Sequence, residues 1–147
     1  MEICPNILVK EIVCPHTWDK FKDNSIKFLD KDLILCIDVV RNQILKKPII
    51  INDGNNTQRG LRCNICEIPK AKTLANQIYL SQHLFGKAID FTCKGFTIQQ
   101  IHDLIIKYQD LLPCKIRLES IENAPTWCHI DVMCDPKQIE KVYIFKA

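Results

Sequence analysis

Hydrophobic residues recur at helical spacing in two stretches of the chain. The first begins after Asp30 and ends before Pro48, and its apolar positions are Leu33, Cys36, Ile37, Val40 and Ile44. Asp30 is a residue type that caps helix N-termini, and Pro48 cannot continue a helix. The second begins at Thr97, and its apolar positions are Ile98, Ile101, Leu104, Ile105 and Tyr108. We therefore predict two main helices, the second opened by a capping box of Thr97 and Gln100.

Shorter stretches alternate between apolar and polar residues, or are apolar throughout, as β-strands are. They cover residues 49–51, 88–93, 115–119, 127–132 and 141–145. Together with the two helices, these strands predict a single α+β domain over residues 1–147, in which the helices pack on a small, mostly antiparallel sheet. Residues 1–29 show neither period, so we predict an irregular N-terminal arm.

Two of the predicted strands carry metal-binding residue types on one face. Asp90 lies on the polar face of the first, and His129 and Asp131 share the polar face of the second. His83 lies seven residues before Asp90, with Gly86 between them where the chain can turn tightly. If the two strands are neighbours, His83, Asp90 and His129 converge. Three protein ligands that leave one position for water are typical of a catalytic zinc site.

Around these residues the sequence resembles the M15 family of zinc peptidases, which includes D-Ala-D-Ala carboxypeptidases, dipeptidases and phage endolysins that cleave peptidoglycan peptides. The family motif Ser-x-His-x-x-Gly-x-Ala-x-Asp is matched at Ser81, His83, Gly86, Ala88 and Asp90, and the motif Trp-x-His at Trp127 and His129. The match spans roughly residues 48 to 134. The resemblance implies the M15 fold, which Hedgehog-like proteins share, and zinc binding by His83, Asp90 and His129.

A zinc peptidase also needs a carboxylate that handles protons without binding the metal. Glu119 ends the predicted strand at 115–119 on its polar face, and Glu122 lies in the loop that follows. In many members of the family the base lies three residues before the second histidine, where this chain has Thr126. We predict Glu119 as the catalytic base, because a strand holds a side chain more firmly than a loop, with Glu122 as the alternative.

Three further polar residues are candidates for the site. The resemblance implies that an arginine upstream of the metal motif binds or polarises the substrate, and Arg59 is the candidate for this catalytic and substrate-binding role. Ser81 is predicted to bind substrate or to brace its own loop. Asp131 is predicted to orient a ligand histidine from behind, or to lie at the surface.

The chain has nine cysteines, an odd number that cannot all pair with one another. Cys63 and Cys66 have the spacing of metal ligands, and Cys14 and His16 could complete a Cys3His site for a second, structural zinc. Such a site would fix the N-terminal arm beside the loop that carries Arg59. A redox pair or two core thiols are the alternatives for Cys63 and Cys66.

Composition and charge limit the partners and the cellular location that we expect for such an enzyme. The net charge of +3 is small and scattered, which argues against a nucleic-acid partner, and no apolar run is long enough to predict a membrane span. The N-terminus lacks the pattern of a secretory signal. We therefore expect a monomer that is made in the cytoplasm and acts on the cell wall after release, as a phage or prophage lysis enzyme does.

The function predicted from these features is that of a zinc-dependent metallopeptidase that hydrolyses peptide bonds in peptidoglycan stem peptides. Two alternatives stay open. One is a non-catalytic zinc-binding module of the same fold, because relatives of this fold keep the zinc without cutting. The other is a zinc-stabilised structural protein of a virion or tail, which would need Cys63 and Cys66 for folding and tolerate the loss of His83.

Overall fold

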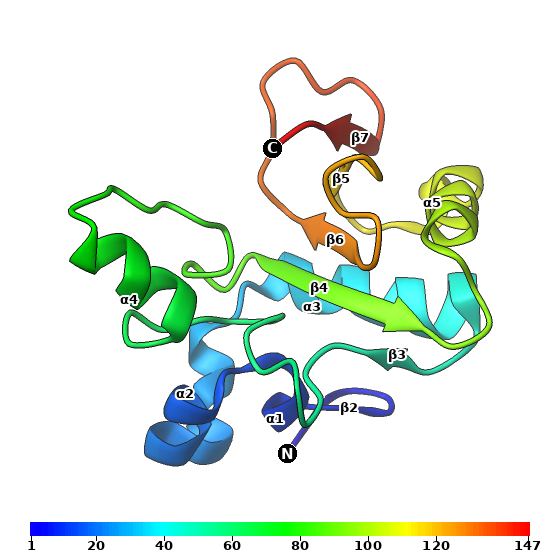
Figure 1. Ribbon diagram of the computed structural model, residues 1–147. Helices are drawn as coiled ribbons and strands as arrows, with labels where there is room; N and C mark the ends of the chain where they lie inside the picture. The colour runs from blue at the N-terminus through cyan, green and yellow to red at the C-terminus, as the bar shows by residue number, and fades with distance from the viewer.

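A five-stranded sheet runs through the centre of the computed structural model, which describes residues 1–147 (Figure 1). Its strands lie in the order β3 (Ile49–Ile50), β4 (Ala88–Cys93), β6 (Cys128–Asp131), β5 (Ile116–Glu119) and β7 (Val142–Phe145). Neighbouring strands pair antiparallel except β5 and β7, which are parallel. The sheet is therefore mixed, and the predicted α+β class is confirmed.

The chain also forms five α-helices. In chain order they are α1 (Val9–Ile12), α2 (Pro15–Phe21), α3 (Lys31–Asp38), α4 (Glu67–Leu74) and α5 (Ile98–Lys107). A π-helical segment, η2 (Val39–Leu45), continues α3, and two 3-10 segments are η1 (Lys22–Phe28) and η3 (Gln109–Leu111). None of the helices has the length and hydropathy that a membrane span requires.

The two main helices begin as the sequence predicts. The carboxylate of Asp30 caps α3 by accepting a hydrogen bond from the Asp32 N–H at 2.9 Å. Thr97 and Gln100 form the capping box at the start of α5. The apolar sides of both helices join one core with the sheet, and α3 lies behind β4 in Figure 1. Both predicted helices are confirmed.

Alternation along three adjacent strands gives the sheet an apolar face and a polar face. The residues that point into the core are fully buried and are Ile89, Phe91, Ile116, Leu118, Cys128 and Ile130. The residues between them in sequence point the other way and are Asp90, Arg117, Glu119, His129 and Asp131. Because the core covers the first face, the polar face is left to form a site.

The N-terminal arm differs from the prediction. Residues 1–29 are not irregular, because they contain a hairpin of β1 (Glu2–Cys4) and β2 (Ile7–Leu8), the helices α1 and α2, and the segment η1. Pro15 occupies the first turn of α2, a position that its fixed backbone angle favours. These elements are too short for a hydrophobic period to repeat within them, which is why the sequence pattern does not indicate them.

Candidate metal centre

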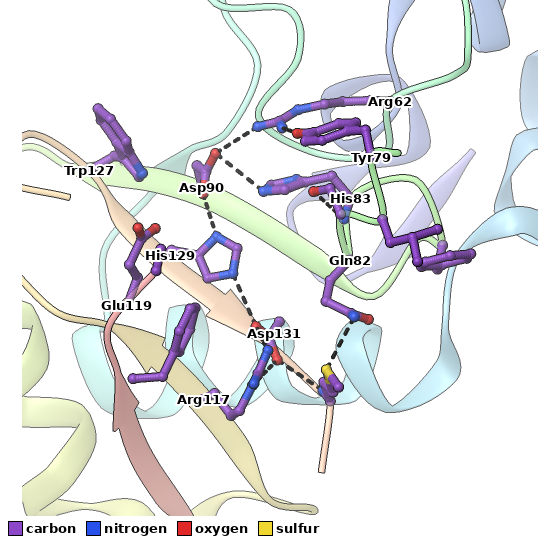
Figure 2. Close-up of a pocket in the computed structure, with 16 residues that line it drawn as sticks. Arg62, Tyr79, Gln82, His83, Asp90, Arg117, Glu119, Trp127, His129 and Asp131 are labelled. Atoms are coloured by element: carbon purple, nitrogen blue, oxygen red, sulfur yellow. Dashed lines mark hydrogen bonds and ion pairs between the residues drawn. The ribbon is translucent and has the colours of Figure 1, made fainter. Parts of the chain in front are cut away.

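Strands β4 and β6 bring two of the predicted metal ligands together. Asp90 and His129 are direct partners in the antiparallel register of these strands. The Nδ1 atom of His129 lies 2.8 Å from Oδ1 of Asp90, and Nε2 of His83 lies 3.4 Å from Oδ2 of the same carboxylate (Figure 2). The donor atoms of the three residues all lie within 4.8 Å of one another. The structure therefore brings the predicted ligand set together.

His83 is held by the turn around it and by a neighbouring loop. Its Nδ1 atom donates to the carbonyl of Gly60 at 2.9 Å, so Nε2 faces Asp90 with a free lone pair. Gly86 has φ of +64°, and a Cβ there would lie 2.0 Å from the carbonyl oxygen of Phe28. Only glycine fits both the backbone angle and this close approach, so Gly86 fixes the turn.

Gly60 and Ser81 complete the support of His83. A Cβ on Gly60 would lie 1.8 Å from the carbonyl oxygen of Ile12, so the loop approaches α1 closely only because position 60 has no side chain. The hydroxyl of Ser81 accepts a hydrogen bond from the His83 N–H at 3.3 Å. Ser81 also lines the cavity at the centre, so its position is compatible with both of its predicted roles.

Asp131 and Arg117 hold His129 from the other side. The Nε2 atom of His129 lies 3.2 Å from Oδ2 of Asp131, and Arg117 binds both oxygens of this carboxylate at 2.9 Å. Asp131 is fully buried, so it does not lie at the surface. With Nε2 engaged by Asp131, Nδ1 is the atom of His129 that is directed toward Asp90 and His83.

Arg62 is a residue of the site that the sequence analysis does not identify. Its guanidinium lies 3.2 Å from Oδ2 of Asp90 and donates to the hydroxyl of Tyr79 at 2.9 Å. These contacts hold Asp90 on the side opposite His129 (Figure 2). Arg59 and Arg62 lie three residues apart in a loop without periodicity, so no pattern in the sequence ranks one above the other.

Arg59 lies next to the centre and contacts it through its backbone. Its carbonyl oxygen accepts a hydrogen bond from the Asp90 N–H at 2.7 Å. Its side chain lines a neighbouring cavity of about 430 Å³, which Arg62, Asp90 and Trp127 also line. Arg59 does not line the cavity that His83 and His129 line.

The two candidate bases lie in different places. Glu119 lines the cavity of about 640 Å³ that His83, Asp90 and His129 also line, and it lies beside His129 in Figure 2. Glu122 is exposed and forms an ion pair of 2.8 Å with Lys146, away from this cavity. Only Glu119 is therefore placed to exchange a proton with a molecule at the centre.

Burial and hydrogen bonding shift the protonation of the site. Burial lowers the pKa of His83. Burial alone would also lower the pKa of His129, but hydrogen bonds to Asp131 and Asp90 outweigh it and raise that pKa to about 9. Burial opposes ionisation of Asp90, yet hydrogen bonds from His129 and His83 hold its pKa well below the usual range. Burial raises the pKa of Glu119; the charge of His129 opposes this rise, and the charges of Asp90 and Asp131 add to it.

The donor set suits a divalent metal ion. Nitrogen and oxygen ligands at about 2.0–2.2 Å from a tetrahedral zinc lie about 3.3–3.6 Å apart. The 3.4 Å spacing of His83 and Asp90 matches this, while the 2.8 Å spacing of His129 and Asp90 is that of a direct hydrogen bond. The outer nitrogen of each imidazole has its own partner, as metal-ligating histidines require.

The four residues proposed for a second metal site also lie together. Ligand atoms of Cys14, His16, Cys63 and Cys66 are all within 4.8 Å of one another. Burial raises the pKa of the Cys66 thiol to about 12, whereas burial of the neighbouring Cys14 is outweighed by hydrogen bonds with Thr17, which lower the pKa of that thiol.

Two clusters in this chain therefore have the composition and spacing of metal sites, one of two histidines and an aspartate and the other of three cysteines and a histidine. Residues 60–63 connect them, because the Gly60 carbonyl supports His83 and Cys63 belongs to the second cluster. Comparison of the chain with protein-family models, with curated proteins and with solved structures finds no match.

Proposed function

We propose that the protein is a zinc-dependent metallopeptidase of the M15 type, with the M15 fold, that hydrolyses peptide bonds in peptidoglycan stem peptides. The observation that carries this proposal is the arrangement of one cavity, in which three metal-binding side chains meet beside a carboxylate that is not paired with a cation. The resemblance of the motifs at residues 81–90 and 127–129 to M15 peptidases supports the substrate class. A phage or prophage lysis enzyme is the setting that we infer.

His83, Asp90 and His129 would hold the zinc ion. When bound, zinc supplies a Lewis acid for a peptide carbonyl and lowers the pKa of a water ligand to near 7. The surrounding residues keep the ligands in place: Arg62 orients Asp90, and Asp131 orients His129. Each of the three ligand side chains is thus held by a hydrogen bond to a residue outside the ligand set.

Glu119 is the residue that we assign to proton transfer. It is half-buried, and it is not paired with a cation, in contrast to Asp131 and Glu122. Its raised pKa brings it closer to neutral pH, where a carboxylate can both take a proton from an attacking water and give it to a leaving amine. Outside the ligand set and the Asp131–Arg117 pair, Glu119 is the only aspartate or glutamate that lines this cavity.

The space around the centre suits an extended peptide. The cavity that contains Glu119 adjoins the cavity that contains Arg59, and they share Arg62, Asp90 and Trp127. A peptide could therefore lie on both sides of the scissile bond, with Trp127 against its apolar parts. Arg59 has a guanidinium suited to a substrate carboxylate, and peptidoglycan stems carry such groups.

The proposed activity is tested by digesting purified peptidoglycan. We expect zinc-loaded protein to release new stem-peptide fragments, identified by mass spectrometry, from walls of at least one stem type. Protein stripped by a chelator should release none, and zinc should restore the release. His83→Ala is the matched variant, since it removes one ligand and leaves Glu119 in place. Absence of fragments from zinc-loaded protein on all stem types would contradict the peptidase and favour a non-catalytic binding module.

Zinc binding at the centre is expected to tighten as pH rises. Because the pKa of His129 is about 9 in the metal-free protein, its ring is protonated at neutral pH and must lose that proton to bind a metal. Burial lowers the pKa of His83, so His83 adds no proton of its own. The apparent affinity should rise about tenfold per pH unit from about pH 7 and level off above about pH 9.

This pH dependence can be measured by competition with a chelator. The Cys63→Ser/Cys66→Ser variant is used as the background, because it removes two of the three thiols of the second cluster and with them the second metal site. Asp131→Asn should flatten the slope, because it removes an anion that stabilises the protonated ring. An affinity that does not change between pH 7 and pH 9 would show that His129 binds no proton in the metal-free protein.

A further inference from the structure

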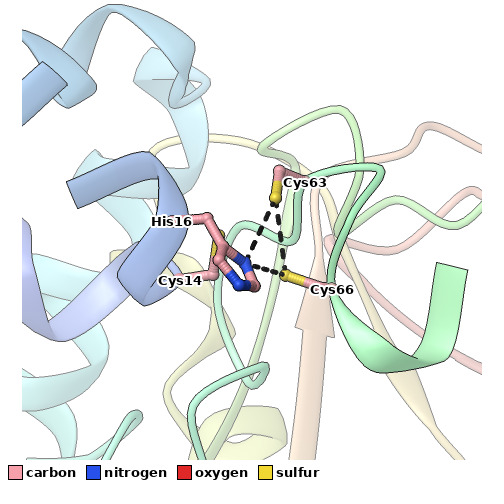
Figure 3. Close-up of side chains that lie close together, drawn as sticks. All are labelled: Cys14, His16, Cys63 and Cys66. Atoms are coloured by element: carbon pink, nitrogen blue, oxygen red, sulfur yellow. Dashed lines mark hydrogen bonds between the residues drawn. The ribbon is translucent and has the colours of Figure 1, made fainter. Parts of the chain in front are cut away.

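Four possible metal ligands meet between helix α2 and the loop that precedes helix α4 (Figure 3). Nδ1 of His16 lies 3.6 Å from the sulfur of Cys63 and 3.6 Å from the sulfur of Cys66. The two sulfurs are 3.7 Å apart. The sulfur of Cys14 lies within 4.8 Å of these atoms. The side chains therefore surround one point.

These distances are those of the corners of a zinc tetrahedron. With Zn–S of about 2.3 Å and Zn–N of about 2.0–2.1 Å, two sulfurs lie about 3.8 Å apart, and a sulfur and a nitrogen about 3.6 Å apart. A disulfide would place the sulfurs of Cys63 and Cys66 about 2.0 Å apart, so these residues are not bonded to each other. His16 is exposed and Cys63 is only half-buried, which does not fit a pair of core thiols.

Backbone hydrogen bonds position the ligands in both segments, the Cys63–Cys66 turn and the start of α2. The Cys66 N–H donates to the Cys63 carbonyl at 3.1 Å, which closes a turn and puts both thiols on one side. Cys14 immediately precedes α2, and His16 lies in its first turn. The Cys14 N–H donates to the Leu61 carbonyl at 2.9 Å, so the two segments are already in register beside each other.

We propose that Cys14, His16, Cys63 and Cys66 bind a structural zinc ion. Four protein ligands leave no position open for water, which distinguishes a structural zinc site from a catalytic one. Three thiolates and an imidazole are soft donors that prefer zinc to magnesium or calcium. The ion joins α2 to the Cys63–Cys66 turn, two segments that are about fifty residues apart in sequence.

The structural zinc also fixes the segment that serves the first centre. Cys63 directly follows Arg62, whose guanidinium binds Asp90. The Arg62 N–H donates to the His83 carbonyl at 3.1 Å, and the carbonyl of Gly60 accepts from the His83 ring. Loss of the structural zinc therefore loosens the support of two ligands at once. This consequence rests on the proposed metal site at His83, whereas zinc binding by the cysteines does not.

The test separates the two zinc ions by their ligands. Elemental analysis gives the zinc content per chain, and X-ray absorption at the zinc edge detects sulfur neighbours at about 2.3 Å. We expect two zinc ions per wild-type chain. The His83→Ala/His129→Ala variant should keep one zinc, surrounded by three sulfurs. The Cys63→Ser/Cys66→Ser variant should keep one zinc without sulfur neighbours, a thermal midpoint lower by roughly 10 °C, and a roughly 10-fold to 100-fold weaker first site.

Cys134→Ser is the matched control, because Cys134 is exposed and lies outside the cluster. It should change neither the zinc content nor the sulfur signal. Zinc without sulfur neighbours in the His83→Ala/His129→Ala variant would overturn the proposal. The loss of two free thiols in metal-free wild type would also overturn it, because it would indicate that Cys63 and Cys66 form a disulfide as a redox pair. The His83→Ala/His129→Ala variant therefore tests whether the cysteines bind zinc even if the Cys63→Ser/Cys66→Ser variant fails to fold. Three sulfurs around zinc in a protein without peptidase activity would support the structural zinc and contradict only the proposed function.

Discussion

Replacing Glu119 with glutamine is expected to slow peptide hydrolysis by about 10²- to 10⁴-fold while zinc stays bound. The amide has nearly the shape of the carboxylate and cannot take a proton from water. Glu119 is not among the three residues that form the ligand set, so the metal content should not change. The measurement is the rate of fragment release from peptidoglycan, together with the zinc content of the same sample.

The pH profile of the wild-type enzyme gives a second test of this role. A base acts in its deprotonated form, so the rate should fall as the pH drops through the pKa of Glu119. Burial raises this pKa in the metal-free protein, whereas the charge of His129 and, in the loaded enzyme, the charge of zinc lower it, so the position of the acidic limb reports the balance of these effects. The residual activity of Glu119→Gln should lack this acidic limb.

Glu122→Gln is the matched control for Glu119→Gln. The same chemical change is made three residues away, on an exposed side chain whose partner is Lys146. We expect wild-type activity from it. Full activity in Glu119→Gln would assign the proton transfer to another group, and activity lost in Glu122→Gln alone would move the base to that residue.

Two of the three ligands, Asp90 and His129, could be predicted because strand alternation determines which side chains share a face, whereas His83 lies in a turn and is predicted from its motif. Once Asp90 and His129 are on the polar faces of two strands, only the pairing of those strands remains open, and β4 and β6 do pair with these residues opposite each other. Glu119 follows by the same rule, because β5 pairs with β6 on its other edge. The alternation of side chains along β4, β5 and β6 therefore predicts that Asp90, Glu119 and His129 share one face of the sheet.

The loop residues could not be predicted in this way. Arg62 reaches Asp90 from a segment whose path is set by Gly60, by its contact with Ile12 and by its hydrogen bond with His83. None of these contacts follows from a local period, because they connect parts of the chain that are distant in sequence. The same applies to α2, whose seven residues are too few to show a repeating apolar side.

Replacing Asp90 with asparagine is expected to remove zinc from the first centre and to destabilise the metal-free protein. The carboxylate is shared by His83, His129 and Arg62, so one substitution removes an anion from three partners. The side chain of Arg62 is only 11% exposed, and a buried cation left without its anion costs about 3–5 kcal/mol. For a domain of this size, that corresponds to a thermal midpoint lower by roughly 10 °C.

A double-mutant cycle separates the ion pair from other effects of this change. Arg62→Met removes the cation and keeps much of the apolar stem, so Asp90→Asn should cost less in the Arg62→Met background than in the wild type. Asp103→Asn, on the exposed side of α5, is the control for loss of one negative charge and should leave the midpoint within about 2 °C. If Asp90→Asn lowered the free energy of unfolding equally in both backgrounds, Arg62 and Asp90 would not be coupled energetically. The cost of Asp90→Asn would then come from the loss of the contacts of Asp90 with His83 and His129. Arg62 would be held by Tyr79 and the Gln58 carbonyl.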